Sequence, residues 1–260
     1  MTSSTHYFFV EIDSFPKRRR VKFISHSVYK ENYIIYYKIK TLSPVHVGSG
    51  LFKVYNNRLL SVNAHSIQGK LIIPGSTMKG VIAHYHLAVI RNTAKTSSLF
   101  GYPGYMSRIC FEDVKPDRTN ISAKIVDVDM SWQPRKKPPK QNMIKLYRPS
   151  LKKTKGKTVQ YLECIPEDTI MSSRIIIINS SLEEVTEVLL SMGYAYNGII
   201  LIGYGKPKGL GKVRVEDVKV ECSTSPSFSL TDKTKEVLSS IEESKKEYKD
   251  NIREVFEINV

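Results

Sequence analysis

The order of strand-like and helix-like segments is the feature that most restricts how this chain folds. Residues 32–42, "NYIIYYKIKTL", alternate and are rich in β-branched and aromatic residues, so they predict a strand that ends at Ser43-Pro44. Apolar residues between Met78 and Val89 recur every three or four positions, as on one face of a helix, and Ser76 is the expected N-cap. Residues 107–115, "SRICFEDVK", predict a further strand. These segments make up a β-α-β unit.

The second half of the chain repeats this order. Residues 161–179 predict a strand, residues 180–193 a helix and residues 211–220 another strand. Ser181 followed by Glu184 forms a capping-box pattern at the start of the second helix. The two halves therefore predict an α+β fold with one or two ferredoxin-like (RRM-type) β-α-β modules around a shared sheet.

Three other segments complete the predicted organisation. Residues 51–69 have a mixed pattern and predict an irregular surface excursion. Residues 130–160 hold ten lysines and arginines with no acid, which predicts an inserted basic arm, although a run of charge is as often a solvated or disordered face. Residues 221–260 predict one or two charged amphipathic helices. We expect a main domain over 1–220, with the insertion at about 130–160, and a C-terminal helical extension over 221–260.

The charge balance indicates the class of partner. The chain has 40 Lys and Arg against 25 Asp and Glu, a net charge of +15 and a pI near 9.6. Such an excess suits polyanions, and nucleic acid is the leading candidate. The sequence shows no basic amphipathic helix, long apolar run or secretory signal, so we expect a cytoplasmic protein without membrane contact. Three widely spaced cysteines fit neither a disulfide framework nor a metal knuckle.

Two stretches have the residue types that bind phosphate. In "IIPGSTMKG" a helix begins at Gly75-Ser76-Thr77 with Lys79 in its first turn, and free N–H groups at a helix start attract anions. Ser76 capping a purely structural helix is an equal alternative. In "GYGKPKGLGKVRV" four glycines alternate with Lys206, Lys208 and Lys212, so backbone amides can turn toward an anion that the lysines hold. A hairpin turn with solvated lysines is the alternative interpretation. A Walker site is excluded because GxxxxGK[ST] is missing.

The remaining candidates are weaker. His46 follows a strand within a glycine loop, but a single histidine is more often structural than catalytic. His84 and His86, two positions apart on a helix, cannot share a face to hold a metal. No nucleophile and base are paired in a recognisable pattern, so we expect no catalytic residue, metal or cofactor. Tyr102, Tyr105, Tyr147 and Tyr204 lie in or beside loops and basic stretches, where rings can stack on unpaired bases.

Taken together, the motifs resemble a known group, the RAMP proteins of CRISPR systems, and specifically the backbone subunits of type III (Csm/Cmr) effector complexes. The resemblance is carried, in order over residues 32–220, by "SPVHVGSG", "IIPGSTMKG", "LFGY", "SRICFEDV" and "GYGKPKGLGKVRVEDV". It implies a ferredoxin-like fold with a thumb-like insertion and stacking of such subunits along a CRISPR RNA. By position it implies RNA contacts at His46, Gly48, Ser76, Lys79, Lys206, Lys208, Gly209 and Gly211. The phosphate-binding stretches described above add Gly75 and Lys212 to these expected contacts. Lys136, Lys137 and Arg148 would lie in or near the thumb.

The resemblance also implies partners and an open question of activity. The expected partners are CRISPR RNA, target RNA, other subunits of a type III complex and copies of the chain itself. Target-cleaving members carry an aspartate between the first two motifs, whereas residues 46–80 here hold no Asp or Glu. A metal-assisted cut needs a carboxylate, so we expect binding without cleavage. The alternatives are a CRISPR RNA-processing endoribonuclease of the same superfamily or a target-RNA-cleaving backbone subunit. A third, an ordinary RRM-type RNA binder, would need the aromatic RNP stretch, which this sequence lacks.

Overall fold

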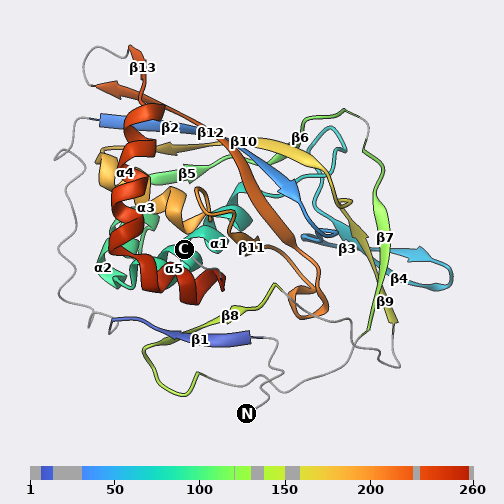
Figure 1. The fold of residues 1–260 in the computed structure, drawn as a ribbon. Helices are drawn as coiled ribbons and strands as arrows, with labels where there is room; N and C mark the ends of the chain where they lie inside the picture. The colour runs from blue at the N-terminus through green and yellow to red at the C-terminus, as the bar shows by residue number, and fades with distance from the viewer. Residues whose placement is uncertain are drawn as a thin grey trace.

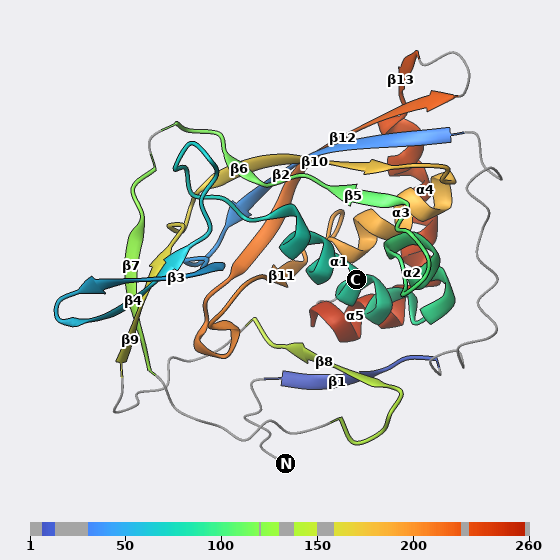
Figure 2. The same ribbon diagram turned by 180° about the vertical axis from the view of Figure 1, so that it is seen from behind.

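The computed structural model describes residues 7–13, 31–119, 121–129, 138–149, 159–224 and 229–257. These residues form a mixed α+β fold with three sheets and five α-helices (Figure 1). The main sheet, the helices and a small two-stranded sheet lie one above the other, as two opposite views show (Figures 1 and 2).

The main sheet is antiparallel and is centred on β2 (Glu31–Thr41). β2 pairs along its whole length with β12 (Lys212–Thr224) and on its other side with β10 (Ile170–Ile177). β5 (Ile109–Phe111) lies beyond β10, and β11 (Ile199–Leu201) lies beyond β12. Two short strands complete the sheet. β6 (Lys115–Pro116) pairs with β10, and β13 (Leu230–Asp232) pairs with β12.

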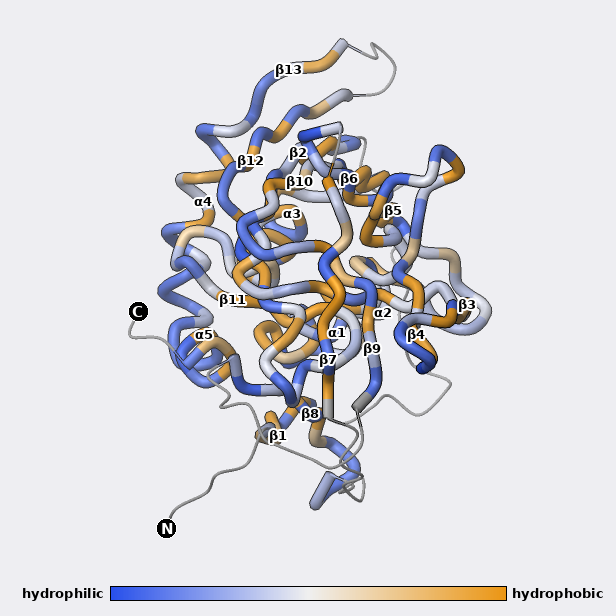
Figure 3. Tube along the Cα trace, turned by 90° about the vertical axis from the view of Figure 1, so that its right-hand side faces the viewer, coloured by the Kyte–Doolittle hydropathy of each residue, from blue (hydrophilic) through white to orange (hydrophobic). Residues whose placement is uncertain are grey.

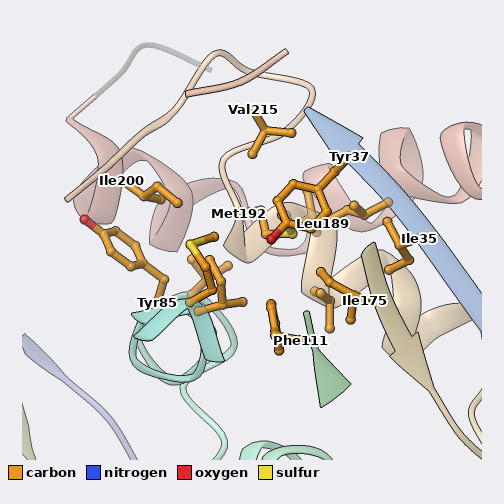
Figure 4. Packing of buried hydrophobic residues seen from close by; sticks show 14 of the residues in the cluster. Ile35, Tyr37, Tyr85, Phe111, Ile175, Leu189, Met192, Ile200 and Val215 are labelled. Atoms are coloured by element: carbon orange, nitrogen blue, oxygen red, sulfur yellow. The ribbon is translucent and has the colours of Figure 1, made fainter. Parts of the chain in front are cut away.

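One face of this sheet is covered by helices. Along β2 the side chains of Tyr33, Ile35, Tyr37 and Ile39 are buried, and this alternation puts them all on the face toward the helices. α1 (Gly75–Ile90), α2 (Thr93–Phe100) and α3 (Leu182–Ser191) fill that side, and residues from both layers interdigitate in the core (Figure 4). Hydrophobic stretches accordingly gather toward the interior of the molecule (Figure 3).

The two predicted β-α-β units share this one sheet. In chain order the units run β2–α1–β5 and β10–α3–β12, and the four strands lie side by side in the order β12, β2, β10, β5. The strand predicted at 32–42 and the helix capping box of Ser181 and Glu184 are confirmed. The strand predicted at 211–220 is also confirmed, although it runs on to Thr224.

The other two sheets are smaller than the main sheet. β3 (Gly48–Tyr55), β4 (Arg58–Asn63), β9 (Val159–Cys164) and β7 (Lys124–Asp129) form a four-stranded sheet in the order β3, β4, β9, β7. The β3–β4 hairpin reaches outward, away from α3, α4 and α5 (Figures 1 and 2). β1 (Tyr7–Glu11) and β8 (Met143–Tyr147) form the small sheet, on the side of the helices opposite the main sheet.

Several sequence predictions about elements were wrong. Of the excursion predicted at residues 51–69, only 64–69 is irregular, because β3 and β4 form a hairpin around Asn56-Asn57, both at positive φ as a tight two-residue turn requires. The single strand predicted at 161–179 is two strands in different sheets, β9 and β10. Residues 107–115 give two short strands rather than one. Ser76 is not an N-cap: Pro74 has that position, and Ser76 lies within the first turn of α1.

Both C-terminal helices are present and join the main core. α4 (Thr234–Glu247) and α5 (Lys249–Phe256) confirm the prediction of charged amphipathic helices. Val237, Ile241, Ile252 and Phe256 are buried in the same hydrophobic cluster as the sheet residues. The Phe256 ring stacks on Tyr85 of α1, with centroids 5.4 Å apart, which fixes α5 against the first helix.

Candidate nucleic-acid interface

A cavity of about 370 Å³ opens between α1 and β8. The first three turns of α1 form one wall, β8 forms the opposite wall, and the glycine-rich loop closes one end with Lys206. We call this the α1–β8 cavity. Its lining comprises Ser76, Thr77, Gly80, Val81, His84, Tyr85, Lys145, Leu146, Tyr147, Leu201 and Lys206. The lining contains lysines, a histidine and hydroxyl groups but no carboxylate, so it suits an anionic ligand.

The start of α1 is fixed against β5 rather than left open. A Cβ atom at Gly75 would lie 2.1 Å from the carbonyl oxygen of Phe111, so only glycine allows the helix to begin this close to the strand. The N–H of Gly75 donates to Oδ1 of Asp113 at 2.9 Å. A carboxylate of the chain therefore already satisfies the first free N–H group. Anion binding at this end of α1 depends on the exposed Ser76 and the neighbouring side chains.

Lys206 and His84 are two of the titratable groups that line the cavity. Lys206 lies in the short 3₁₀-helix η1 (Lys206–Lys208), and burial lowers the pKa of its amine. Burial also lowers the pKa of His84, assisted by the charge of Lys206 and opposed by the hydrogen bond to β8. That bond runs 2.8 Å from Nε2 to the carbonyl oxygen of Lys145. Because a carbonyl only accepts, Nε2 carries the proton and Nδ1 has the lone pair in the neutral ring.

The two glycine motifs of the sequence pack against each other. A Cβ at Gly203, where φ is +74°, would lie 2.1 Å from the carbonyl oxygen of His46. Tyr204 N–H donates to that same oxygen at 2.9 Å, and Gly211 N–H donates to the carbonyl of Pro44 at 2.9 Å. Gly203 and Gly211 thus permit close approach of backbone to backbone. Sequence reasoning had assigned that approach to phosphate.

His46 lies beneath this junction with both ring nitrogens paired. Its side chain is only 2 % exposed. Nδ1 donates to the carbonyl oxygen of Glu163 at 2.7 Å, and Nε2 accepts from the Ser61 hydroxyl at 3.1 Å. Burial is the main cause that lowers its pKa, so the ring is neutral. His46 therefore connects β9 and β4 to the loop and presents no free nitrogen to solvent.

The other predicted contact residues lie in different surroundings. Ser76 and Lys206 line the α1–β8 cavity, whereas Lys79 is half-buried on another side of α1. Lys208, Gly209 and Lys212 are half-buried in or beside the glycine loop, Gly211 is buried and Gly48 is exposed on β3. Arg148 is ion-paired with Glu257 and lies over the Phe8 ring. Lys136 and Lys137 lie outside the described residues.

Sequence reasoning found the basic run at 130–160 but missed a second basic stretch nearer the N-terminus. Residues 14–30, 130–137 and 150–158 hold thirteen of the forty basic residues and none of the acids, and all three lie outside the described residues. The described residues thus carry 27 basic against 25 acidic side chains, close to neutrality. Counting charge in windows would have found the stretch 14–30, which has six lysines and arginines. Two of these segments, 130–137 and 150–158, precede and follow β8 in the sequence.

The fold and this arrangement define a mixed α+β protein with an acid-free cavity beside its first helix. The model of the RAMP superfamily matches residues 38–214, more than half of the chain, so the chain belongs to the RAMP superfamily. RAMP proteins act in complexes that contain CRISPR RNA, which makes this a CRISPR-associated protein. No curated protein matches the chain. None of the helices in the described ranges is long and apolar enough to cross a membrane.

Proposed function

We propose that the chain is an RNA-binding backbone subunit of a type III CRISPR effector complex, which binds the RNA backbone irrespective of sequence and does not cleave it. The observation that carries this proposal is the acid-free α1–β8 cavity with Lys206 at one end. Family membership supports the RNA partner. The order β12, β2, β10, β5 supports a ferredoxin-like core, in which two β-α-β units interleave in one antiparallel sheet.

The three basic segments and the lysines in and near the α1–β8 cavity have different roles in this proposal. The three basic segments supply most of the electrostatic attraction, because each neutralised phosphate releases counterions. The cavity and the surface lysines Lys79, Lys208 and Lys212 place the strand without reading its bases, since contacts to phosphate carry no sequence information. Tyr147 in the cavity and the half-exposed Tyr204 provide rings on which bases can stack.

The test is the salt dependence of RNA binding by Lys206→Ala. We expect weaker binding to all single-stranded sequences and a slope of log K against log salt reduced by about 0.7, the value for one phosphate contact. Lys219→Ala is the matched control, because Lys219 lies on the main sheet in an ion pair with Glu221 at 2.7 Å. Neutralising the six basic residues of 14–30 should reduce the slope by about 4. Equal effects of Lys206→Ala and Lys219→Ala would contradict the assignment.

One observation favours a second candidate, an endoribonuclease of the processing type. His84 has a lowered pKa and lines the same cavity as Lys206, which suits a neutral base that takes the proton from a ribose 2′-hydroxyl. Incubating the protein with RNA in a metal chelator distinguishes the two functions. Products with a 2′,3′-cyclic phosphate that disappear in His84→Ala would favour this candidate. Intact RNA would favour the backbone subunit.

A further inference from the structure

A serine and a histidine form a hydrogen-bonded pair at the inner end of the β3–β4 hairpin. The Ser61 hydroxyl donates to Nε2 of His46 at 3.1 Å, and Nδ1 of His46 donates to the carbonyl oxygen of Glu163 at 2.7 Å. The carbonyl fixes the tautomer of the neutral ring, so Nε2 keeps its lone pair toward the serine. An activated nucleophile has these same parts: a hydroxyl, a base within hydrogen-bond distance, and a group that orients the base. Ser61 follows His46 by 15 positions, too far for a sequence pattern to pair them.

The serine reaches the surface, whereas its histidine partner does not. His46 is buried and Ser61 is half-buried. Gly48 lies next to both side chains: a Cβ there would be 3.3 Å from Nε2 of His46 and 3.8 Å from Oγ of Ser61. Because Gly48 is itself exposed, its missing side chain leaves the hydroxyl open to solvent. The register of β3 on β4 also shifts between Gly48 and Phe52, as at a β-bulge, and bulges are frequent next to active sites.

Exposed apolar side chains extend from Ser61 along one face of the hairpin. Phe52 is the direct cross-strand partner of Ser61, and Val54 is that of Leu59. Direct partners and alternate residues point the same way, so all four side chains share one face. Phe52, Val54 and Leu59, which we call the apolar strip, are 58 %, 78 % and 62 % exposed. Since a strand rises about 3.4 Å per residue, the strip reaches about 7 Å from the serine along β4. Contiguous exposed apolar surface of this kind marks a binding site, here beside a nucleophile.

We propose that Ser61 is the nucleophile of an acyl-transfer site, with His46 as its base and the apolar strip as the surface that binds the acyl chain of a short-chain ester. Oγ of Ser61 attacks the ester carbonyl carbon, and its proton passes to Nε2 of His46. The bond from that carbon to the alcohol oxygen then breaks, and the alcohol leaves with the proton from His46. Water attacks the acyl-serine by the same route, its proton passing through Nε2 back to Oγ. One ester and one water are consumed, and one acid and one alcohol are formed.

This activity does not depend on RNA, so the test uses the nuclease-treated full chain and an alkyl fluorophosphonate probe. A reactive serine forms a bond from Oγ to phosphorus while fluoride leaves, and the mass of the adduct reports it. We expect one adduct, on Ser61, and none in Ser61→Ala. His46→Gln can still donate to the Glu163 carbonyl but cannot take the proton, so it should slow labelling by about a hundredfold or more. Gly48→Leu should also slow labelling, because it covers the hydroxyl while both groups of the pair remain.

Ser49→Ala is the matched control for the nucleophile. Ser49 is exposed on the same hairpin, but its hydroxyl donates to the carbonyl oxygen of Val62 at 3.0 Å, and a carbonyl cannot take its proton. This variant should label like the wild type. An unlabelled Ser61, or equal labelling rates in the wild type and in a folded His46→Gln, would overturn the proposal. Circular dichroism shows which variants fold, and Gly48→Leu keeps the test decisive if His46→Gln does not.

The apolar strip is tested by the choice of ester. The wild type should hydrolyse 4-nitrophenyl hexanoate with a kcat/KM about tenfold above that for 4-nitrophenyl acetate, because the longer chain buries more apolar surface. Val54→Ser should reduce this preference and leave the rate of the acetate unchanged. Equal kcat/KM values for the two esters in the wild type would exclude the strip as the surface that binds the acyl chain.

Discussion

Glu187 is a buried carboxylate whose removal should be costly. It lies on α3 with a side chain 2 % exposed, and it accepts from Lys95 Nζ at 2.7 Å and from the Tyr248 hydroxyl at 3.0 Å. Nε2 of His86, itself buried, lies 3.7 Å from the other carboxylate oxygen. Glu187 thus connects α1, α2, α3 and the junction of α4 and α5 through one group. Glu187→Gln keeps the shape and the bond to Tyr248 but removes the charge.

The loss of unfolding free energy in Glu187→Gln depends on which partners lose their counter-charge. Breaking a buried ion pair on one side costs about 3–5 kcal/mol, and we expect about 3 kcal/mol because Lys95 keeps part of its surface in water. The matched control is Glu183→Gln on the same helix. Glu183 contacts the same Lys95 at 2.8 Å, but its side chain is 65 % exposed. That variant should cost less than about 1 kcal/mol in urea unfolding at neutral pH.

The pH dependence gives an independent check. Burial by itself would raise the pKa of Glu187, but the neighbouring His86 and the hydrogen bond and charge of Lys95 outweigh it and lower the pKa below its ordinary 4.5. A carboxylate with a lowered pKa stabilises the fold above its unfolded pKa, and that contribution is lost as pH falls through the folded value. The wild type should therefore lose stability below about pH 4.5 more steeply than Glu187→Gln. Equal losses of unfolding free energy in Glu187→Gln and Glu183→Gln would refute this reasoning. So would an equally steep loss of stability at acid pH in the wild type and in Glu187→Gln.

Two glycine substitutions test the close contacts of the site, each with a control that lacks the contact. Gly75→Ala places a methyl group against the Phe111 carbonyl and should cost about 2–3 kcal/mol of unfolding free energy, whereas Gly80→Ala on the open side of the same helix should stabilise by up to about 1 kcal/mol. Gly203→Ala combines strain at positive φ with a clash, so it should cost more than Gly69→Ala, where φ is +75° and the space is open, for which about 1–2 kcal/mol is expected. Equal costs within either pair, measured by urea unfolding, would contradict the contact distances.

The sequence predicted those elements whose pattern arises from a shared buried face. β2 alternates because its inner residues meet the helices, and α3 shows its start because Ser181 and Glu184 cap each other locally. The β3–β4 hairpin escaped prediction because its outer part has no buried face and therefore no alternation of apolar and polar residues. The break between β9 and β10 escaped because a chain that passes from one sheet to another keeps its β-rich composition on both sides.

Some residues that line the α1–β8 cavity could be predicted because they too have local sequence signals. Ser76 and Lys206 could be found because exposed hydroxyls and lysines beside glycines are local signals, and both line the cavity. The interpretation of Gly75, Gly203 and Gly211 could not be settled by sequence, since a glycine signals only that something approaches closely. Here the approaching group is the chain's own carbonyl in each case. Whether a glycine makes room for a ligand or for backbone depends on contacts between residues far apart in the sequence.

The separation of charge from fold suggests how RNA binding is divided within the molecule. The described residues are nearly neutral, and several cations on the outer face of the main sheet are paired with acids, as with Arg174 and Glu112 at 2.7 Å and Lys219 and Glu221 at 2.7 Å. A face in which acids already neutralise the bases gains little from phosphate, so the open side of the main sheet is a poor RNA site. In the proposed function, attraction therefore comes from the three basic segments, and the α1–β8 cavity positions the strand.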